Sequence, residues 1–416
     1  MKISTNIIKE LYLVTLLLIN NTFLKEVNPI FTYISFVVYF FLKFKFILHS
    51  PYFYFLGWSI YLLPSINKYS NIIKYEVSEY INYFIIGIFF FSLIYEKFSN
   101  KEIIFKNFYK INYQNLDKLA FSCFFYMGVF NIAFKLLNYS TDITKGISLI
   151  LNQTITASIF AYLVTIARKD IKEAFLKSLL VFSYFIFTNL FLLTNTSRIN
   201  ILQSGLLILT ILIIGKNKFN FNKFKVFYGF GEIISKYTFL FLCSLLASSK
   251  RVITGGDSII VYNASNLIQF LKNNHKFEPL MPIHNGLLVL FPKSLLPFKK
   301  PINFNSSAWI INNIYQINPE IIPYGTSGTL VGASYIYGGI SGVILVFSII
   351  AVITVYLQSL IDSYFFLAFY IYFLFNLSFS IFRMDETFFL GPFIPFLITT
   401  FFYKKLFKKY IYEKNN

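Results

Sequence analysis

The feature that most constrains this chain is the repeated occurrence of long apolar segments. We expect about 12 of them to span, or nearly span, a hydrocarbon core about 30 Å thick. The predicted fold class is therefore an all-α polytopic integral membrane protein. The predicted spans are residues 7–24, 30–48, 52–66, 80–95, 119–137, 147–167, 174–194, 199–215, 233–249, 330–357, 363–381 and 387–403.

Composition and charge placement agree with this prediction. The chain is 56% hydrophobic and 13% charged, with a mean hydropathy of +0.62, which lies well outside the range of soluble domains. Its lysines concentrate in the connections 96–118, 167–173 and 216–232 and in the C-terminal tail. Cytoplasmic connections carry such an excess, so both termini are predicted to be cytoplasmic. The net charge of +19 thus reflects topology and attraction to anionic membrane lipids, and nucleic acid is not an expected partner.

One connection, residues 250–328, is far longer than the others and is predicted to lie on the external side. The predicted organisation therefore has three parts: a bundle of helices 1–9 (residues 1–249), the external loop packed on it, and helices 10–12 with a basic cytoplasmic tail (residues 329–416). A loop of this length is usually functional. Within it, residues 257–273 place apolar side chains on one helical stripe, which predicts a helix lying on the membrane surface or on the bundle. The stripe consists of Ile260, Ala264, Leu267 and Leu271.

Arginine is rare and unevenly placed. Of the 37 basic residues only four are arginine, and three of these, Arg198, Arg251 and Arg383, lie where predicted helices meet the external side. A guanidinium offers a planar fork of donors that can hold a phosphate or carboxylate in two places, which lysine cannot do. The pattern predicts an anionic ligand at the outer face. The alternative is that each arginine only reaches the lipid headgroups.

Several kinds of chemistry lack their signatures here. The sequence contains no Asp-x-Asp, no nucleotide-type Gly-rich loop, no Gly-x-Ser-x-Gly and no His-Glu-x-x-His. Two cysteines within predicted helices and three scattered histidines indicate neither a disulfide nor a metal site, and no cofactor is expected. Mid-span charges are scarce, which argues against ion-coupled transport. An outer surface with fixed cations suits a lipid-linked diphosphate whose leaving group needs charge stabilisation.

Two segments in the C-terminal half carry a family resemblance. Phe291–Pro301 (FPKSLLPFKKP) resembles the proline- and basic-rich segment in the periplasmic loop of bacterial O-antigen and oligosaccharide repeat-unit polymerases, the Wzy family. Gly325–Gly342 (GTSGTLVGASYIYGGISG) resembles the Gly-rich run that follows this loop in that family. The Thr-Ser-Arg198 end of a predicted helix is similar to the family's earlier periplasmic arginine. Lys293 stands where the family often has arginine.

The resemblance implies a metal-independent polymerase with the GT-C-like helical architecture shared with O-antigen ligases, in the bacterial inner membrane. It implies undecaprenyl-diphosphate-linked glycan as substrate, with a chain-length regulator and a flippase as protein partners. Charge neutralisation is assigned to Arg198, Arg251 and Arg383, with Lys293 and Lys300 as secondary substrate-binding cations. The candidates for a general base or an acceptor contact are Asp257, Glu278, His284, Asp385 and Glu386.

Alternatives from other classes remain open. A lipid-linked oligosaccharide flippase has a similar number of spans, but it should show two similar halves and no dominant loop. An O-antigen ligase or membrane acyltransferase would use histidine-centred chemistry, and the His284-Asn285 pair resembles that of the ligases. The pairs Gly328/Gly332 and Gly338/Gly342 are small-xxx-small patterns that predict close helix packing, and Gly338-Gly339 also predicts a kink.

Overall fold

The computed structural model describes part of the chain in detail. The described residues are 5–22, 28–43, 49–99, 110–112, 114–115, 117–118, 121–122, 125, 156–167, 169–191, 205–208, 210–211, 259–279, 306–317, 328–361, 364–382 and 412–413. They are helical apart from connections and one pair of two-residue antiparallel strands, β1 (Lys110–Ile111) and β2 (Tyr412–Glu413). The predicted helical fold is confirmed for this part of the chain, with that small strand pair as its one departure.

The chain forms two compact units, each built from several segments. Unit 1 comprises residues 1–101, 243–359 and 376–390, and unit 2 comprises residues 102–242, 360–375 and 391–416. The three predicted parts, divided after residues 249 and 328, rest on membrane sidedness and stay a prediction.

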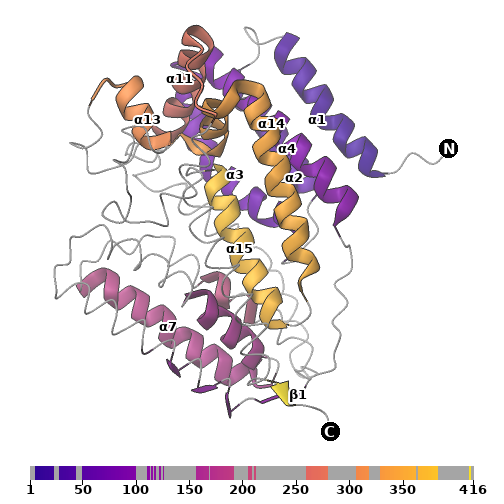
Figure 1. Cartoon of the computed structure of the whole chain (residues 1–416), viewed down its shortest axis with the longest axis vertical. Helices are drawn as coiled ribbons and strands as arrows, with labels where there is room; N and C mark the ends of the chain where they lie inside the picture. The colour runs from indigo at the N-terminus through magenta and orange to yellow at the C-terminus, as the bar shows by residue number, and fades with distance from the viewer. Residues whose placement is uncertain are drawn as a thin grey trace. The chain divides into compact units, whose positions relative to one another are not determined.

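Four helices at the start of the chain belong to unit 1 (Figure 1). These are α1 (Thr5–Thr22), α2 (Pro29–Lys43), α3 (Pro51–Ser70) and α4 (Lys74–Phe98). Helix α3 begins with Pro51 at its first position, where the missing N–H costs nothing. It joins α4 through a tight turn in which Ile72 N and Ile73 N both donate to Tyr69 O. The predicted spans 7–24, 30–48, 52–66 and 80–95 overlap these helices, and α3 and α4 extend beyond the spans predicted for them.

Three further helices complete the described part of unit 1, together with the end of α15. They are α11 (Ile259–Asn274), α13 (Ser306–Asn313) and α14 (Thr329–Ser359), while α15 covers Tyr364–Phe382. Helix α14 packs along α4, and α11 lies on α14, α4 and α3. The helix predicted within 257–273 is thus confirmed, and its four stripe residues are all buried. It packs on the bundle, which decides between the two positions considered for it.

The glycine-rich start of α14 explains how α11 approaches so closely. A Cβ on Gly332 would lie 3.6 Å from Ala264 Cα, so the two helix backbones are in near contact. The helix breaks at Gly338 and Gly339, and Gly339 adopts φ 63° and ψ −138°, a conformation that only glycine adopts readily. A Cβ on Gly342 would overlap the Ser334 carbonyl oxygen across this break. The predicted kink is confirmed, and close helix packing is confirmed for Gly328 and Gly332; for Gly338 and Gly342 that prediction is wrong, because Gly338 has open space beside it and Gly342 lies against the backbone of its own helix.

The core of unit 1 is aromatic. The Phe84 ring lies 5.3 Å from Phe36 and 4.9 Å from Phe382, and Phe55 lies 5.2 Å from Phe91. Interhelical amide hydrogen bonds add polar links, such as Asn20 Nδ2 donating to Asn82 Oδ1 at 2.6 Å. Such bonds between small polar side chains are a usual means of holding membrane helices together.

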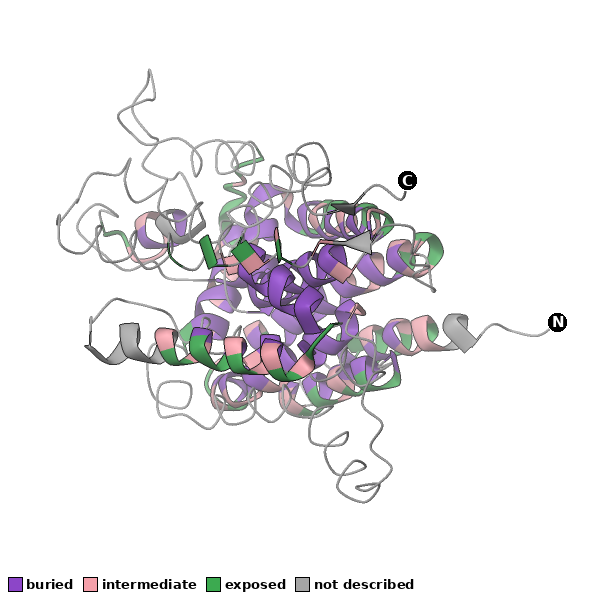
Figure 2. Ribbon diagram, turned by 90° about the horizontal axis from the view of Figure 1, so that it is seen from below, coloured by how far each residue is buried: buried purple, intermediate pink, exposed green. Residues whose placement is uncertain are grey.

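The exposed side chains of these helices indicate the kind of environment that surrounds them. Figure 2 shows buried faces turned inward and exposed residues running along the outer sides of the helices. On α14 four of the exposed side chains are large and apolar and follow one helical stripe: Leu345, Ile349, Val352 and Tyr356. A continuous apolar stripe facing outward is costly in water and suits contact with lipid. Among the described residues, three helices are long and apolar enough to cross a membrane, namely α4, α14 and α15.

The full count of twelve spans stays a prediction. Spans 233–249 and 387–403 lie outside the described residues, and spans 119–137, 147–167 and 199–215 are described only in part. In unit 2, α7 (Ile171–Phe191) follows a helix over residues 156–167 and is capped by Asp170 Oδ1, which accepts from Lys172 N at 2.9 Å.

Candidate functional site

Of the site residues predicted from the sequence, the structure describes Glu278. The others lie outside the described residues: Arg198, Arg251, Asp257, His284, Lys293, Lys300, Arg383, Asp385 and Glu386. A shared cavity lined by the three arginines therefore stays a prediction. The site is built here from Glu278 and from what the structure places around it.

Glu278 is held on the break in α14. Helix α11 ends at Asn274, and His275, with φ 53°, turns the chain out of the helix. The Glu278 amide then donates to the Ile336 carbonyl at 2.8 Å, which supplies a donor to a helix turn interrupted by the glycine kink. Phe277 packs against Gly339, and its ring centroid lies 6.3 Å from that of Tyr335. The Glu278 side chain is exposed, so its carboxylate faces outward beside the kink.

A buried carboxylate lies on the same three helices. Glu79 of α4 accepts a hydrogen bond from Lys272 Nζ of α11 at 2.5 Å, and its side chain is only 8% exposed. The Lys272 side chain is 35% exposed, so the pair opens toward the surface on the lysine side. Burial lowers the pKa of Lys272, but the hydrogen bond and charge of Glu79 outweigh it and leave that pKa raised. Lys272 is therefore a cation at neutral pH.

Tyrosines surround this ion pair. The rings of Tyr83 on α4 and Tyr335 on α14 lie 4.8 Å apart, and Tyr75, one turn before Glu79, forms a side-chain hydrogen bond with its carboxylate. We call Tyr75, Glu79, Tyr83, Lys272 and Tyr335 the Glu79 cluster. It combines one anion, one cation and three phenol hydroxyls at the junction of three helices.

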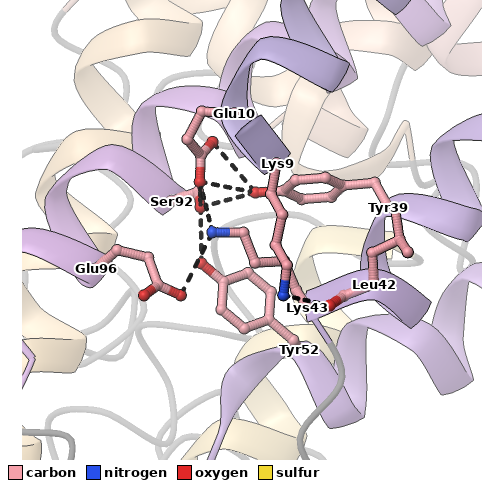
Figure 3. Close-up of polar contacts among 8 residues, drawn as sticks. All are labelled: Lys9, Glu10, Tyr39, Leu42, Lys43, Tyr52, Ser92 and Glu96. Carbon is pink, nitrogen blue, oxygen red and sulfur yellow. Dashed lines mark hydrogen bonds and ion pairs between the residues drawn. The ribbon is translucent and has the colours of Figure 1, made fainter. Parts of the chain in front are cut away.

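A second polar cluster joins α1, α2 and α4, as Figure 3 shows. Lys43 of α2 is 2% exposed and lies between Glu10 at 2.6 Å and Glu96 at 3.6 Å. The Ser92 hydroxyl donates to Glu10 Oε1 at 2.7 Å and accepts from Tyr39 at 2.7 Å. We call this group, with Tyr52, the Lys43 cluster. Its charges are paired with one another.

The two clusters lie at opposite ends of one helix. Glu79 and Glu96 are separated by 17 positions on α4, which corresponds to about 25 Å at 1.5 Å per residue. That distance is close to the thickness of a hydrocarbon core, about 30 Å. On α4, which is long and apolar enough to cross a membrane, the two clusters thus have the spacing expected of groups at the two boundaries of such a core. The Lys43 cluster is closed by its own hydrogen bonds, whereas the Glu79 cluster is partly open and adjoins Glu278, so the Glu79 cluster is the candidate functional site.

Comparison with known proteins supplies no relative: no family model, no curated protein and no solved structure matches this chain. The fold and the site by themselves define a class, a helical membrane protein with a polar cluster at each end of a long apolar helix. Any more particular function is a proposal.

Sequence reasoning missed Glu79 and gave Lys272 no role beyond the loop's charge. Glu79 directly precedes the predicted span 80–95, with tyrosines four residues before and after it, and this spacing places all three on one helical face. This spacing could have indicated Glu79 from the sequence alone. The sequence could not indicate its partner, because Lys272 is 193 positions away in the chain.

Proposed function

We propose that this protein polymerises undecaprenyl-diphosphate-linked oligosaccharide repeat units at the outer face of the bacterial inner membrane. Both termini are then cytoplasmic, and the product is an O-antigen, a capsule or an exopolysaccharide. The observation that carries the proposal is the packing of α11, a helix of the predicted external loop, across the ends of α4 and α14. It brings Lys272 to a buried carboxylate at the place where the Gly-rich run enters the bundle.

The packing of α11 supports the proposal because polymerisation needs a rigid outer surface that holds two lipid-linked substrates together. Positioning of the reacting groups supplies a large part of the rate in such a transfer. The loop segment that resembles the polymerases, Phe291–Pro301, lies between α11 and α13 in the chain, and the Gly-rich segment forms the start of α14. The two packed helices therefore bracket the loop segment.

The reaction we propose is a direct glycosyl transfer. A hydroxyl of the incoming repeat unit attacks the anomeric carbon of the growing chain, and the bond from that carbon to the diphosphate oxygen breaks. The electron pair stays on undecaprenyl diphosphate, whose charge Arg198, Arg251 and Arg383 neutralise, with Lys293 and Lys300 assisting. The proton of the attacking hydroxyl passes to a carboxylate or a histidine. A flippase and a chain-length regulator are the protein partners that this role requires.

The polysaccharide pattern of a strain lacking the gene tests this function directly. Loss of a polymerase leaves the lipid core carrying a single repeat unit, and the plasmid-borne chain restores the ladder. Loss of a flippase or a ligase leaves no attached repeat unit at all. In a strain whose product is an O-antigen, absence of the single-unit band or an unchanged ladder would exclude a polymerase, and for a capsule or an exopolysaccharide undiminished polymer would exclude it.

A further inference from the structure

The face of α11 that meets α4 carries buried polar atoms whose bonding is incomplete. Glu79 Oε2, Ser265 Oγ and Gln269 Oε1 have no hydrogen-bond partner in the part of the chain that the structure describes. Gln269 and Ser265 lie one and two turns before Lys272, so the three share one face of α11. Lys272 fixes that face toward Glu79 through their ion pair. We call Glu79, Ser265, Gln269 and Lys272 the α4–α11 seam.

A ligand that donates hydrogen bonds would satisfy these three atoms. A buried acceptor without a donor costs about 1–3 kcal/mol, and more if it is charged. Glu79 as a residue is 7% exposed and Ser265 is fully buried, so bulk water does not reach them freely. A carboxylate oxygen, an amide oxygen and a hydroxyl together match a neutral molecule rich in hydroxyl groups. Lys272, at one end of the seam, is 35% exposed, so the seam meets the surface there.

We propose that the α4–α11 seam binds a sugar ring of the acceptor repeat unit and that Glu79 is the catalytic base. This proposal rests on the proposed polymerase function and extends it to a residue and a substrate group. The acceptor hydroxyl donates to Glu79 Oε2, and as its oxygen bonds to the anomeric carbon its proton moves to that carboxylate. The anomeric bond to the diphosphate breaks with its electron pair on the diphosphate, and Glu79 later releases the proton to water.

Lys272 acts in this scheme as a positioning residue. Its bond to Glu79 Oε1 orients the carboxylate and leaves the other oxygen for the acceptor. Gln269 contributes acceptor binding without taking part in proton transfer.

The test uses Glu79→Gln in the deletion strain, because this change keeps the size of the side chain and removes the base. The control is Glu96→Gln, which makes the same change on the same helix, at a carboxylate that is also paired with a lysine but lies in the Lys43 cluster. We expect Glu79→Gln to lower the transfer rate by about a hundredfold or more and to leave the single-unit band. Glu96→Gln should give a normal ladder at equal protein level in the membrane.

Kinetics on membrane vesicles supplied with the lipid-linked repeat unit separate catalysis from binding. Glu79→Gln should lower kcat, whereas Gln269→Leu should raise KM with a smaller change in kcat. If Glu79→Gln does not accumulate, Glu79→Asp replaces it, and shortening the carboxylate by one methylene should still reduce the rate.

Full-length polymer from Glu79→Gln at normal protein level would overturn the inference, since a base could not be dispensable, and an unreduced transfer rate in Glu79→Asp would overturn it too, because a catalytic carboxylate cannot be displaced by one methylene without loss. Equal loss in Glu79→Gln and Glu96→Gln would also overturn it, because the effect would then belong to the helix. Both results leave the polymerase proposal standing, provided that the deletion strain shows the single-unit band. Absence of that band removes the proposed function itself.

Discussion

Replacing Lys43 by methionine should destabilise unit 1 strongly, although methionine fits an apolar helix. Lys43 is 2% exposed and neutralises Glu10 at 2.6 Å and Glu96 at 3.6 Å. Removing one member of a buried ion pair leaves an uncompensated charge and costs about 3–5 kcal/mol. Glu10 keeps its bond from Ser92, so we expect the lower end of this range, about 3 kcal/mol. At about 2–4 °C per kcal/mol for a unit of this size, the melting midpoint should fall by about 6–12 °C.

The assay is thermal unfolding of the purified protein in detergent, followed by the fraction that remains monodisperse. Lys177→Met is the matched control, because Lys177 also pairs with two carboxylates, Asp117 at 2.8 Å and Glu173 at 2.7 Å, but is 36% exposed. Exposed pairs contribute about 0–1 kcal/mol. The double variant Glu10→Gln with Lys43→Met removes both charges and should recover part of the loss. Equal midpoints for Lys43→Met and Lys177→Met would refute the argument that burial makes the Lys43 cluster a structural clamp.

Three further predictions concern topology, packing and the arginines. In a background without native cysteines, a cysteine at Lys276 should react with an impermeant reagent from outside, whereas one at Lys106 should not; equal labelling would contradict the topology. Gly342→Ala should destabilise by about 1–3 kcal/mol, because its Cβ overlaps a backbone carbonyl, whereas Gly338→Ala, with open space around it, should change thermal stability little. Arg198→Ala should lower polymerisation more than a hundredfold, about 3 kcal/mol of transition-state stabilisation, and Arg198→Lys should restore it in part. Full-length polymer from Arg198→Ala at normal protein level would make that arginine a membrane-surface anchor.

Helix positions could be predicted from the sequence wherever hydropathy alone decides them. The span predicted at 330–357 is α14 (Thr329–Ser359), and that at 363–381 is α15 (Tyr364–Phe382). The span 80–95 was placed too late, because α4 begins at Lys74. A hydropathy boundary marks where apolar side chains begin, whereas a helix continues through a polar turn if its backbone stays hydrogen-bonded. The turn from Lys74 to Glu79 is such an extension, and it carries the candidate site.

Pairings between distant segments could not be predicted in the same way. The apolar stripe on α11 predicted that one face of the helix would be buried, but it did not indicate which helices would cover that face. Ala264 meets Gly332 because both residues are small, and this contact in turn fixes which face of α11 turns to α4. Lys272 then reaches Glu79 as a consequence of the packing. The ion pair is thus a product of tertiary structure, and its two residues taken singly are ordinary charges beside a membrane.

Glutamate–lysine pairs lie at both ends of α4, and we expect them to have different roles because their surroundings differ. Around Lys43 the helices α1, α2 and α4 enclose the ammonium, and hydroxyls of Ser92 and Tyr39 complete the bonding of Glu10. Around Glu79 one carboxylate oxygen is satisfied by Lys272 and the other has no partner among the described residues. Near an apolar layer an incompletely bonded carboxylate is expensive, and such groups usually mark a substrate or ion pathway. The difference in bonding between two clusters on one helix is therefore the reason to expect function at the Glu79 end and stability at the Lys43 end.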